Sequence, residues 1–310
     1  IVDDALNNKT AAGTQFAGGL TGVDYTLRSD NGSVTIDTAT KVNGSCLTLS
    51  GTSIVINPVL TLECLNTSGA ITINNNLSMT EDTTFSGAVT IGGNITISAG
   101  TGTLTFGSTV SGGANDFTLE ADELQINNTI SGTGTLTMQP FTVGRGVDLA
   151  QTEGSTPGDP TAGIFDLTAN ELGRVQNGFA QINIGRTNGT GAMRAVNGTV
   201  FSDPLALRMP GSGGTIRVNT LMVNDGGAIA FDTPAATLAS TIRTNAGAPS
   251  SGNIVLGQVV HVYASDSIIN AKLHVDPAAL DAVGRMGGTA YCHTRDRFDI
   301  PLGLAALKAP

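Results

Sequence analysis

Short segments in which apolar and polar residues alternate follow one another between residues 33 and 143. They include SVTID, SIVIN, AITIN, AVTIG, NITIS, GTLTF and GTLTM. A period of two is typical of a β-strand with one buried face. Between the segments lie NGS, SGT, NTSG, GGN and SGTG, whose residues favour tight turns. The pattern therefore predicts many short strands joined by turns too short to contain helices.

These segments repeat imperfectly along the chain. GAITI at Gly69 recurs as GAVTI at Gly87, and GTLTF at Gly102 recurs as GTLTM at Gly134. A period in the high teens to twenties is what one coil of a β-solenoid occupies, and each coil buries its apolar side by stacking on the next. We therefore expect an all-β solenoid. A β-sandwich is the alternative, because it also has short strands at regular spacing.

The composition limits the core and the partners. Hydrophobic residues make up 40% of the 310 residues, but only 4% are aromatic and Trp is absent, so the core must consist of small and β-branched side chains. Disorder is the alternative for a chain with 41 Gly, yet Val, Ile and Leu recur regularly. The net charge of −10 argues against nucleic acid and anionic membrane surfaces as partners. We also expect no membrane-spanning segment, because no apolar run approaches about eighteen residues.

Acidic residues dominate the first half of the repeats. No Lys or Arg occurs between Lys41 and Arg145, and the acidic residues in that interval are densest at Asp116, Glu120, Asp122 and Glu123. We interpret these four as a solvated rim. The more specific alternative is that these residues form a weak Ca²⁺ site, because carboxylate oxygens are the ligands that Ca²⁺ prefers. No other cofactor is predicted.

Two of the three cysteines are separated by the same interval as Gly69 and Gly87. In a solenoid, Cys46 and Cys64 would therefore lie above one another on adjacent coils, at a distance that suits a disulfide. Such a bond would place the chain in an oxidising, extracytoplasmic compartment. Two buried free thiols are the alternative, and Cys292 is left without a predicted partner. The chain begins at Ile1 without Met or a leader, as expected of a processed or excerpted mature region.

We assign no catalytic residue and predict that the chain is not an enzyme. His261, His274 and His293 are interpreted as structural, and the adjacent Cys292 and His293 would point to opposite faces of a strand. A β-helical polysaccharide lyase or glycosidase is the enzymatic alternative. Such chemistry uses converging carboxylates, or Ca²⁺-binding acids with an Arg or Lys base.

Three stretches from about residue 120 onward share a recurring pattern, namely ADELQINNTISGTGTLTMQPFTVGRGVDLA, IFDLTANELGRVQNGFAQINIGRTNGTGAM and VFSDPLALRMPGSGGTIRVNTLMVNDGGAIAFD. They resemble the recurring units of filamentous-haemagglutinin-like giant bacterial surface proteins. The residues that match the family pattern are Leu167, Thr168, Glu171, Leu172, Arg174, Ile182, Ile184, Gly185 and Arg186. The likeness covers roughly residues 69 to 232, but family members are often far longer than this chain.

The resemblance implies a right-handed parallel β-helix that is secreted and serves adhesion, aggregation or biofilm matrix formation at the cell surface. It carries no shared catalytic site. We therefore expect an extracellular structural or adhesive protein, either a self-assembling filament subunit or an adhesin module. Its expected partners are other copies of itself, or the surface of a host or neighbouring cell. A polysaccharide lyase or a glycan-binding protein is the alternative function.

Changes of pattern divide the chain into four parts. Residues 1–32 are an N-terminal cap or entry segment, 33–150 are solenoid coils, 151–263 continue the solenoid with loop insertions, and 264–310 form a small irregular or α-containing C-terminal cap or docking segment. Within the last part, DPAALDAVG predicts a short helix from Asp276 to about Gly284.

An open solenoid end must be capped or joined to another molecule, because it exposes unpaired backbone groups. The charged and then apolar tail is our candidate for subunit docking, with capping inside one chain as the alternative. The docking candidates are Arg295, Arg297, Phe298, Ile300, Leu302 and Leu304.

Overall fold

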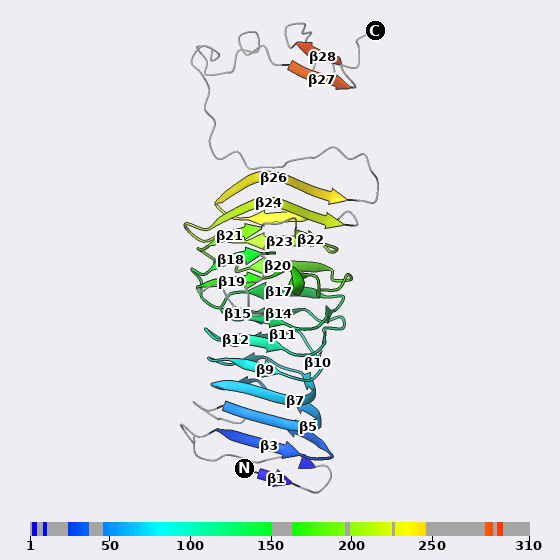
Figure 1. The fold of residues 1–310 in the computed structure, drawn as a ribbon, viewed down its shortest axis with the longest axis vertical. Helices are drawn as coiled ribbons and strands as arrows, with labels where there is room; N and C mark the ends of the chain where they lie inside the picture. Colours follow the sequence, from blue (N-terminus) through cyan, green and yellow to red (C-terminus); the bar gives the residue numbers. More distant parts are fainter. Residues whose placement is uncertain are drawn as a thin grey trace, which may run out of the picture. The chain divides into compact units, whose positions relative to one another are not determined.

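The fold is that of a β-solenoid of about nine turns, and the described residues contain almost no helix (Figure 1). The computed structural model describes residues 2–4, 9–10, 24–36, 46–150, 163–195, 199–224, 227–245, 283–287 and 290–293. The chain divides into two compact units, residues 1–253 and 254–310. The solenoid lies in the first unit, and its strands pair in parallel throughout.

Three sheets make up the described solenoid. The 12-stranded sheet contains β1 (Val2–Asp4), β2 (Lys9–Thr10), β3 (Tyr25–Ser29), β4 (Ser33–Ile36), β5 (Cys46–Ile56), β7 (Cys64–Ile73), β9 (Thr83–Phe85), β10 (Val89–Ile91), β12 (Thr103–Phe106), β13 (Val110–Ser111), β15 (Glu123–Ile126) and β16 (Ile130–Ser131). The 8-stranded sheet contains β6 (Leu60–Thr61), β8 (Leu77–Ser78), β11 (Ile95–Ser98), β14 (Phe117–Glu120), β17 (Thr135–Gln139), β20 (Gln181–Gly185), β23 (Leu205–Arg208) and β25 (Ile229–Asp232). The 6-stranded sheet contains β18 (Gly146–Leu149), β19 (Ile164–Leu167), β21 (Ala192–Ala195), β22 (Thr199–Phe201), β24 (Thr215–Asn224) and β26 (Ala235–Asn245).

One coil consists of three short strands that occupy three faces. The chain runs through β12, β13 and β14, and the next coil begins with β15, which pairs in register with β12. β16 then pairs with β13, and β17 pairs with β14. Away from the insertion described below, side-chain hydrogen bonds between neighbouring coils join residues 17 to 25 apart. The predicted period, in the high teens to twenties, is therefore confirmed.

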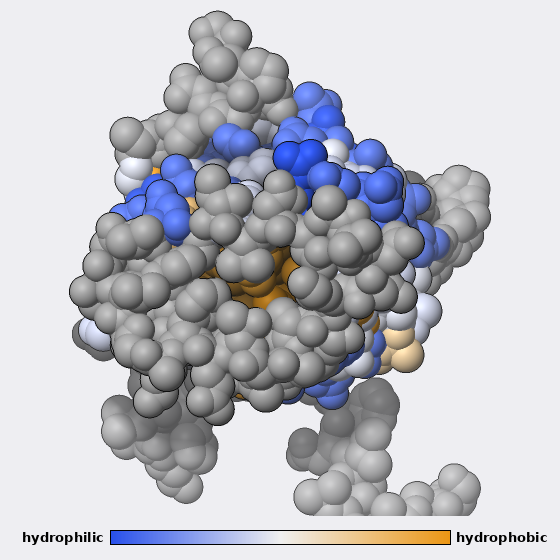
Figure 2. Space-filling model, turned by 90° about the horizontal axis from the view of Figure 1, so that it is seen from below, coloured by the Kyte–Doolittle hydropathy of each residue, from blue (hydrophilic) through white to orange (hydrophobic). Residues whose placement is uncertain are grey.

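The core lies inside the coils, where the inward residue of each strand stacks on its counterpart one coil away. Phe85 and Phe106 are fully buried Cα partners, and their rings stack with centroids 5.5 Å apart. On another face, Ile54, Ile71 and Val89 form a buried row of β-branched residues. Figure 2, which views the molecule from below, shows apolar side chains at the centre and hydrophilic ones at the periphery, mainly toward the top and right of the view. The alternating pattern thus reflects a buried interior and a solvated exterior.

Glycines stack at one corner of the early coils. A Cβ atom on Gly69 would lie 1.9 Å from the carbonyl oxygen of Gly51, and one on Gly87 would lie 1.9 Å from that of Gly69. Gly69 also has a φ of 122°, which side-chain-bearing residues rarely adopt. Close backbone approach therefore explains why GAITI and GAVTI both begin with glycine.

One strand departs from the order of the coils. β19 pairs with β18 and also contacts β15, so it lies between them although it follows β18 in the sequence. The short helix α1 (Ala169–Leu172) follows β19, and Val175 then bridges to Ile130 in β16. Because β20 returns to pair with β17, the coils resume after this insertion.

In the second unit, the described residues form an antiparallel pair of strands, β27 (Val283–Gly287) and β28 (Ala290–His293). The helix predicted from Asp276 to about Gly284 is wrong at its end, because Gly284 pairs with Cys292 in this hairpin. Residues 276–282 lie outside the described residues, as does the whole of the docking candidate from Arg295 to Leu304. No helix in the described part of the chain is long and apolar enough to span a membrane.

Candidate functional site

Asn and Asp side chains join the coils at their corners. The Oδ1 atom of Asn76 accepts a hydrogen bond of 2.8 Å from the backbone N–H of Thr96, one coil further on. In the same way, Asn94 accepts from the N–H of Asp116, and Asp116 accepts from the N–H of Thr135. Each of these three residues immediately precedes the first apolar residue of a strand. That position is the signal by which the sequence could have revealed this corner row.

A groove of about 370 Å³ runs beside this corner row. Its lining residues are Asn76, Asn94, Ile95, Thr96, Asp116, Phe117, Thr118, Thr135 and Thr137. The Asn and Asp side chains are exposed, whereas the threonines are half-buried. Thr96, Thr118 and Thr137 are successive Cα partners in β11, β14 and β17, so they form a row along the stack. We call this row the threonine floor.

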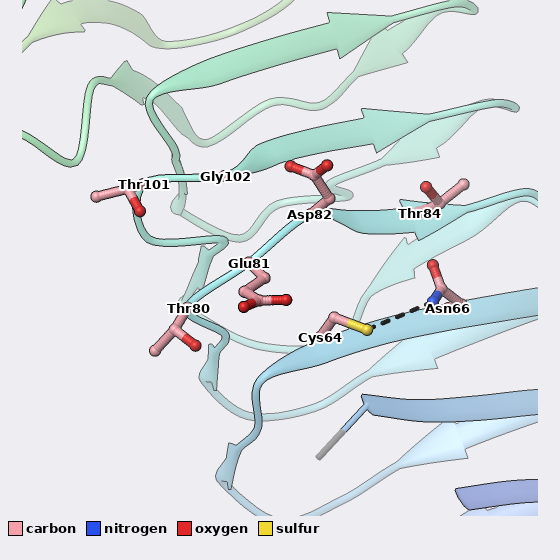
Figure 3. A pocket seen from close by; sticks show the side chains of 8 residues that line it. All are labelled: Cys64, Asn66, Thr80, Glu81, Asp82, Thr84, Thr101 and Gly102. Atoms are coloured by element: carbon pink, nitrogen blue, oxygen red, sulfur yellow. Dashed lines mark hydrogen bonds between the residues drawn. The ribbon is translucent and has the colours of Figure 1, made fainter. Parts of the chain in front are cut away.

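A second polar groove, of about 450 Å³, lies on a different part of the surface (Figure 3). It is lined by Cys64, Asn66, Thr80, Glu81, Asp82, Thr84, Thr101 and Gly102. Asp82 again bridges coils, because its Oδ1 accepts a 2.7 Å hydrogen bond from the N–H of Thr103. In the part of the chain that the structure describes, neither groove has a Lys or Arg in its lining.

The two predicted disulfide residues meet at the edge of the second groove. Cys46 and Cys64 are Cα partners in β5 and β7, with their Cα atoms 4.4 Å apart, and a disulfide joins them. The bond therefore crosses from one coil to the next. Asn66 lies beside it and donates a hydrogen bond to the Cys64 sulfur (Figure 3). Cys292 lies in β28 of the second unit.

The solvated rim predicted for the acidic residues is wrong for two of the four. Asp122 is 4% exposed and Glu123 is 6% exposed. Arginines from later coils also reach this acidic stretch: Arg145 lies 3.4 Å from Asp122, and Arg186 lies 3.0 Å from Glu120. The sequence has no Lys or Arg between Lys41 and Arg145, but the fold brings Arg145 and Arg186 beside the acidic residues of this interval.

The four acidic candidates for a Ca²⁺ site have separate partners. Asp116 accepts from the N–H of Thr135, whereas Asp122 accepts from both the N–H and the hydroxyl of Thr142. Glu120 accepts from Ser98, Gln139 and Arg186. Within the described residues, no group of three or more His, Cys, Asp or Glu side chains could hold a metal ion.

Glu123 belongs instead to a buried carboxyl cluster around the inserted strand, together with Asp166 of β19 and Glu171 of α1. Burial, followed by the charge of Asp166, a hydrogen bond with Asp166 and the charge of Glu171, raises the pKa of Glu123 to about 9, and Arg145 partly opposes the shift. The Glu123 carboxyl is therefore protonated at neutral pH and hydrogen-bonds to Asp166. Its Oε2 atom is buried and has no hydrogen-bond partner among the described residues.

Glu171 anchors the insertion to the coil below it. Its carboxylate accepts hydrogen bonds from the N–H of Ile126 at 3.0 Å and from the N–H and hydroxyl of Thr168 at 2.9 Å. Thr168 in turn accepts from the N–H of Glu171, which completes a capping box at the start of α1. Burial raises the pKa of Glu171, although these hydrogen bonds oppose the rise. The T-x-x-E spacing could have revealed this helix start.

An ion pair flanks the cluster on its other side. Asp148 of β18 is 1% exposed and accepts from Nε of Arg194 at 2.8 Å, with a second hydrogen bond from the Arg194 guanidinium to its other oxygen. Asp148 thereby raises the pKa of Arg194. Because Asp148 and Arg194 are Cα partners in β18 and β21, this pair ties β18 to the next strand of the stack.

The comparisons with known proteins assign no family. No protein-family model matches the chain, and no solved structure matches it. A stretch of 50 residues is 52% identical to an uncharacterized protein of Deinococcus radiodurans, and it covers 15% of the chain and 22% of that protein. The chain therefore spans only about a fifth of the length of this relative. The resemblance to filamentous-haemagglutinin-like proteins stays a prediction, although the β-solenoid fold agrees with it.

Proposed function

We propose that the chain is an extracellular structural or adhesive surface protein that acts through stacking of its coils, as a self-assembling filament subunit or as a module of a larger adhesin. Its localisation at the cell surface or in the secreted fraction is part of this proposal. The disulfide between Cys46 and Cys64 supports it, because such bonds persist in oxidising compartments.

The observation that carries the proposal is the exposure of inward-facing residues in the last coil that the structure describes. The inward row through Val147, Met193 and Ile216 is buried, but Ala236, which continues that row in β26, is exposed. On the neighbouring face, Phe231 continues a buried row and is only half-buried itself. Within the described residues, the solenoid therefore ends with interior positions uncovered.

A second copy would cover this end by continuing the same stack. β26 pairs with β24, and no other described strand pairs with this 11-residue strand. Strand addition at such an edge extends the parallel ladder and buries the apolar row at the same time. Copies of this chain and adhesin neighbours with the same coil geometry are both suited to this contact.

Sedimentation velocity over a range of concentrations tests the proposal. Wild-type protein is expected to form species larger than a monomer, whereas A236K is expected to stay monomeric because it puts a charge at the uncovered interior position. The matched control is A230K, since Ala230 is an exposed residue of the neighbouring strand β25 on the outward side. A wild-type chain that remains monomeric at high concentration, or equal effects of A236K and A230K, would contradict end-to-end assembly.

A polysaccharide lyase or glycosidase is the second candidate function, and the hydrogen-bonded pair of Glu123 and Asp166 is the observation that favours it. Glycoside chemistry uses a pair of carboxyl groups. However, both residues are buried, and neither lines the two polar grooves. Incubation with acidic and neutral polysaccharides tests this candidate: release of unsaturated or reducing ends that is lost in D166N would favour an enzyme over a structural protein.

A further inference from the structure

The groove beside the threonine floor presents a threonine in the same position of three successive coils, namely Thr96, Thr118 and Thr137. Asn76 and Asn94 belong to its exposed wall, whereas the floor is half-buried. Neighbouring coils are about 4.8 Å apart, so the floor threonines recur at that distance. A ligand that follows the groove would meet one floor threonine in each of these coils.

Several of these groups have unused hydrogen-bonding capacity. Asn76 and Asn94 accept backbone hydrogen bonds through Oδ1, and among the described residues their Nδ2 groups donate no hydrogen bond. Among the described residues, no hydrogen bond is made by the hydroxyls of Thr96 and Thr118, whereas Thr137 accepts one from Asn183. Donors and acceptors that are already held in place by coil packing lose little conformational entropy when a ligand binds.

The charge of the groove limits the class of ligand. Among the described lining residues, Asp116 is the one that carries a charge, and the Oδ1 atom of its carboxylate is engaged by the N–H of Thr135. With no cation in that lining, a polyanion such as nucleic acid or an acidic glycan would meet only repulsion. The apolar lining residues Ile95 and Phe117 are buried, so an apolar peptide would find no open pocket here.

We propose that this groove binds an extended, uncharged polysaccharide strand that lies along the stack, across β11, β14 and β17. A sugar residue in an extended chain is about as long as the rise of one coil, so successive sugar hydroxyl groups meet successive threonines of the floor. The proposal specifies the ligand of the adhesive function proposed above, but it does not depend on end-to-end assembly.

Affinity electrophoresis and isothermal titration calorimetry test the proposal. The probes are soluble neutral glucans, namely laminarin, hydroxyethyl cellulose and dextran, with alginate and polygalacturonate as acidic comparisons. The measurements use the A236K protein, so that the result is separate from any assembly. We expect binding to at least one extended neutral glucan and no binding to the acidic polymers.

The double variant T96V/T118V removes two floor hydroxyls and keeps the β-branched shape. It is expected to bind the glucan about thirtyfold more weakly, which corresponds to the loss of two net hydrogen bonds. The matched control is T72V/T90V, because Thr72 and Thr90 are also outward Cα partners on neighbouring coils but lie on another face. Unchanged circular dichroism melting checks that both variants fold.

Three outcomes would overturn the proposal. They are the absence of binding to every neutral glucan, equal weakening by T96V/T118V and T72V/T90V, and a preference for alginate or polygalacturonate. None of them would bear on the sedimentation result, so failure of the groove and failure of assembly are distinguishable.

Discussion

Replacing Glu123 with Gln should stabilise the solenoid at neutral pH. Glu123 is 6% exposed and has a pKa of about 9, against 4.5 for an ordinary Glu. The folded protein therefore binds a proton here between about pH 4.5 and 9 that the unfolded chain releases. The free energy of unfolding then falls as pH rises through this window, because the native state binds more protons than the unfolded state. Gln has the shape of the protonated side chain but does not titrate, so it adds no pH dependence to the free energy of unfolding.

The size of the effect follows from the pKa difference. One pKa unit corresponds to about 1.4 kcal/mol. Keeping Glu123 protonated in the folded state therefore lowers the free energy of unfolding by about 3 kcal/mol at pH 7 and by less than about 1 kcal/mol at pH 5. E123Q is expected to avoid this cost, because its amide can still donate to Asp166. The variant should therefore match the wild type near pH 5 and exceed it increasingly as pH rises.

Urea unfolding followed by circular dichroism between pH 5 and 8.5 measures this difference. The free energy of unfolding of the wild type should fall with pH more steeply than that of E123Q, with a difference of up to about 3 kcal/mol at pH 7. The matched control is E81Q, because Glu81 is an exposed residue of the second groove. If E123Q had the same pH slope as the wild type, or were less stable at pH 7, the conclusion that Glu123 is protonated in the folded protein would be wrong.

Three further perturbations test how the coils are held together. G87A should lower the free energy of unfolding by more than about 3 kcal/mol, because its Cβ would lie 1.9 Å from the Gly69 carbonyl oxygen. Thermal melting measures this, and a melting temperature equal to that of the wild type would contradict the close approach. Reduction of the bond between Cys46 and Cys64 should cost about 3 kcal/mol, and calorimetry with and without dithiothreitol would refute this by showing identical transitions. N94A should cost about 1 kcal/mol in urea unfolding, since a backbone N–H of the next coil loses its acceptor, and an unchanged midpoint would mean that water replaces it.

Periodicity predicts the solenoid because each coil obeys local rules. The alternation in AITIN and AVTIG identifies the inward residues, and the repeat interval alone places Cys46 beside Cys64. Both predictions rest on residues close in sequence that follow one simple winding rule. The corner row of Asn and Asp residues escaped this reasoning, although each member precedes the first apolar residue of its strand.

The inserted strand shows where sequence reasoning fails. Nothing in the alternation of IFDL indicates that β19 lies between β15 and β18, because the order of strands depends on contacts between distant segments. The burial of Glu123 follows from this insertion, and so does its pairing with Asp166. Ion pairs such as that of Arg186 with Glu120 join residues 66 apart, beyond the reach of any local pattern.

Negative-stain electron microscopy of the purified chain tests the central claim most directly. The account predicts filaments in which solenoids join end to end along a continuous axis, lengthening with protein concentration and absent in A236K. Isolated particles at every concentration, with the wild type and A236K indistinguishable, would contradict it.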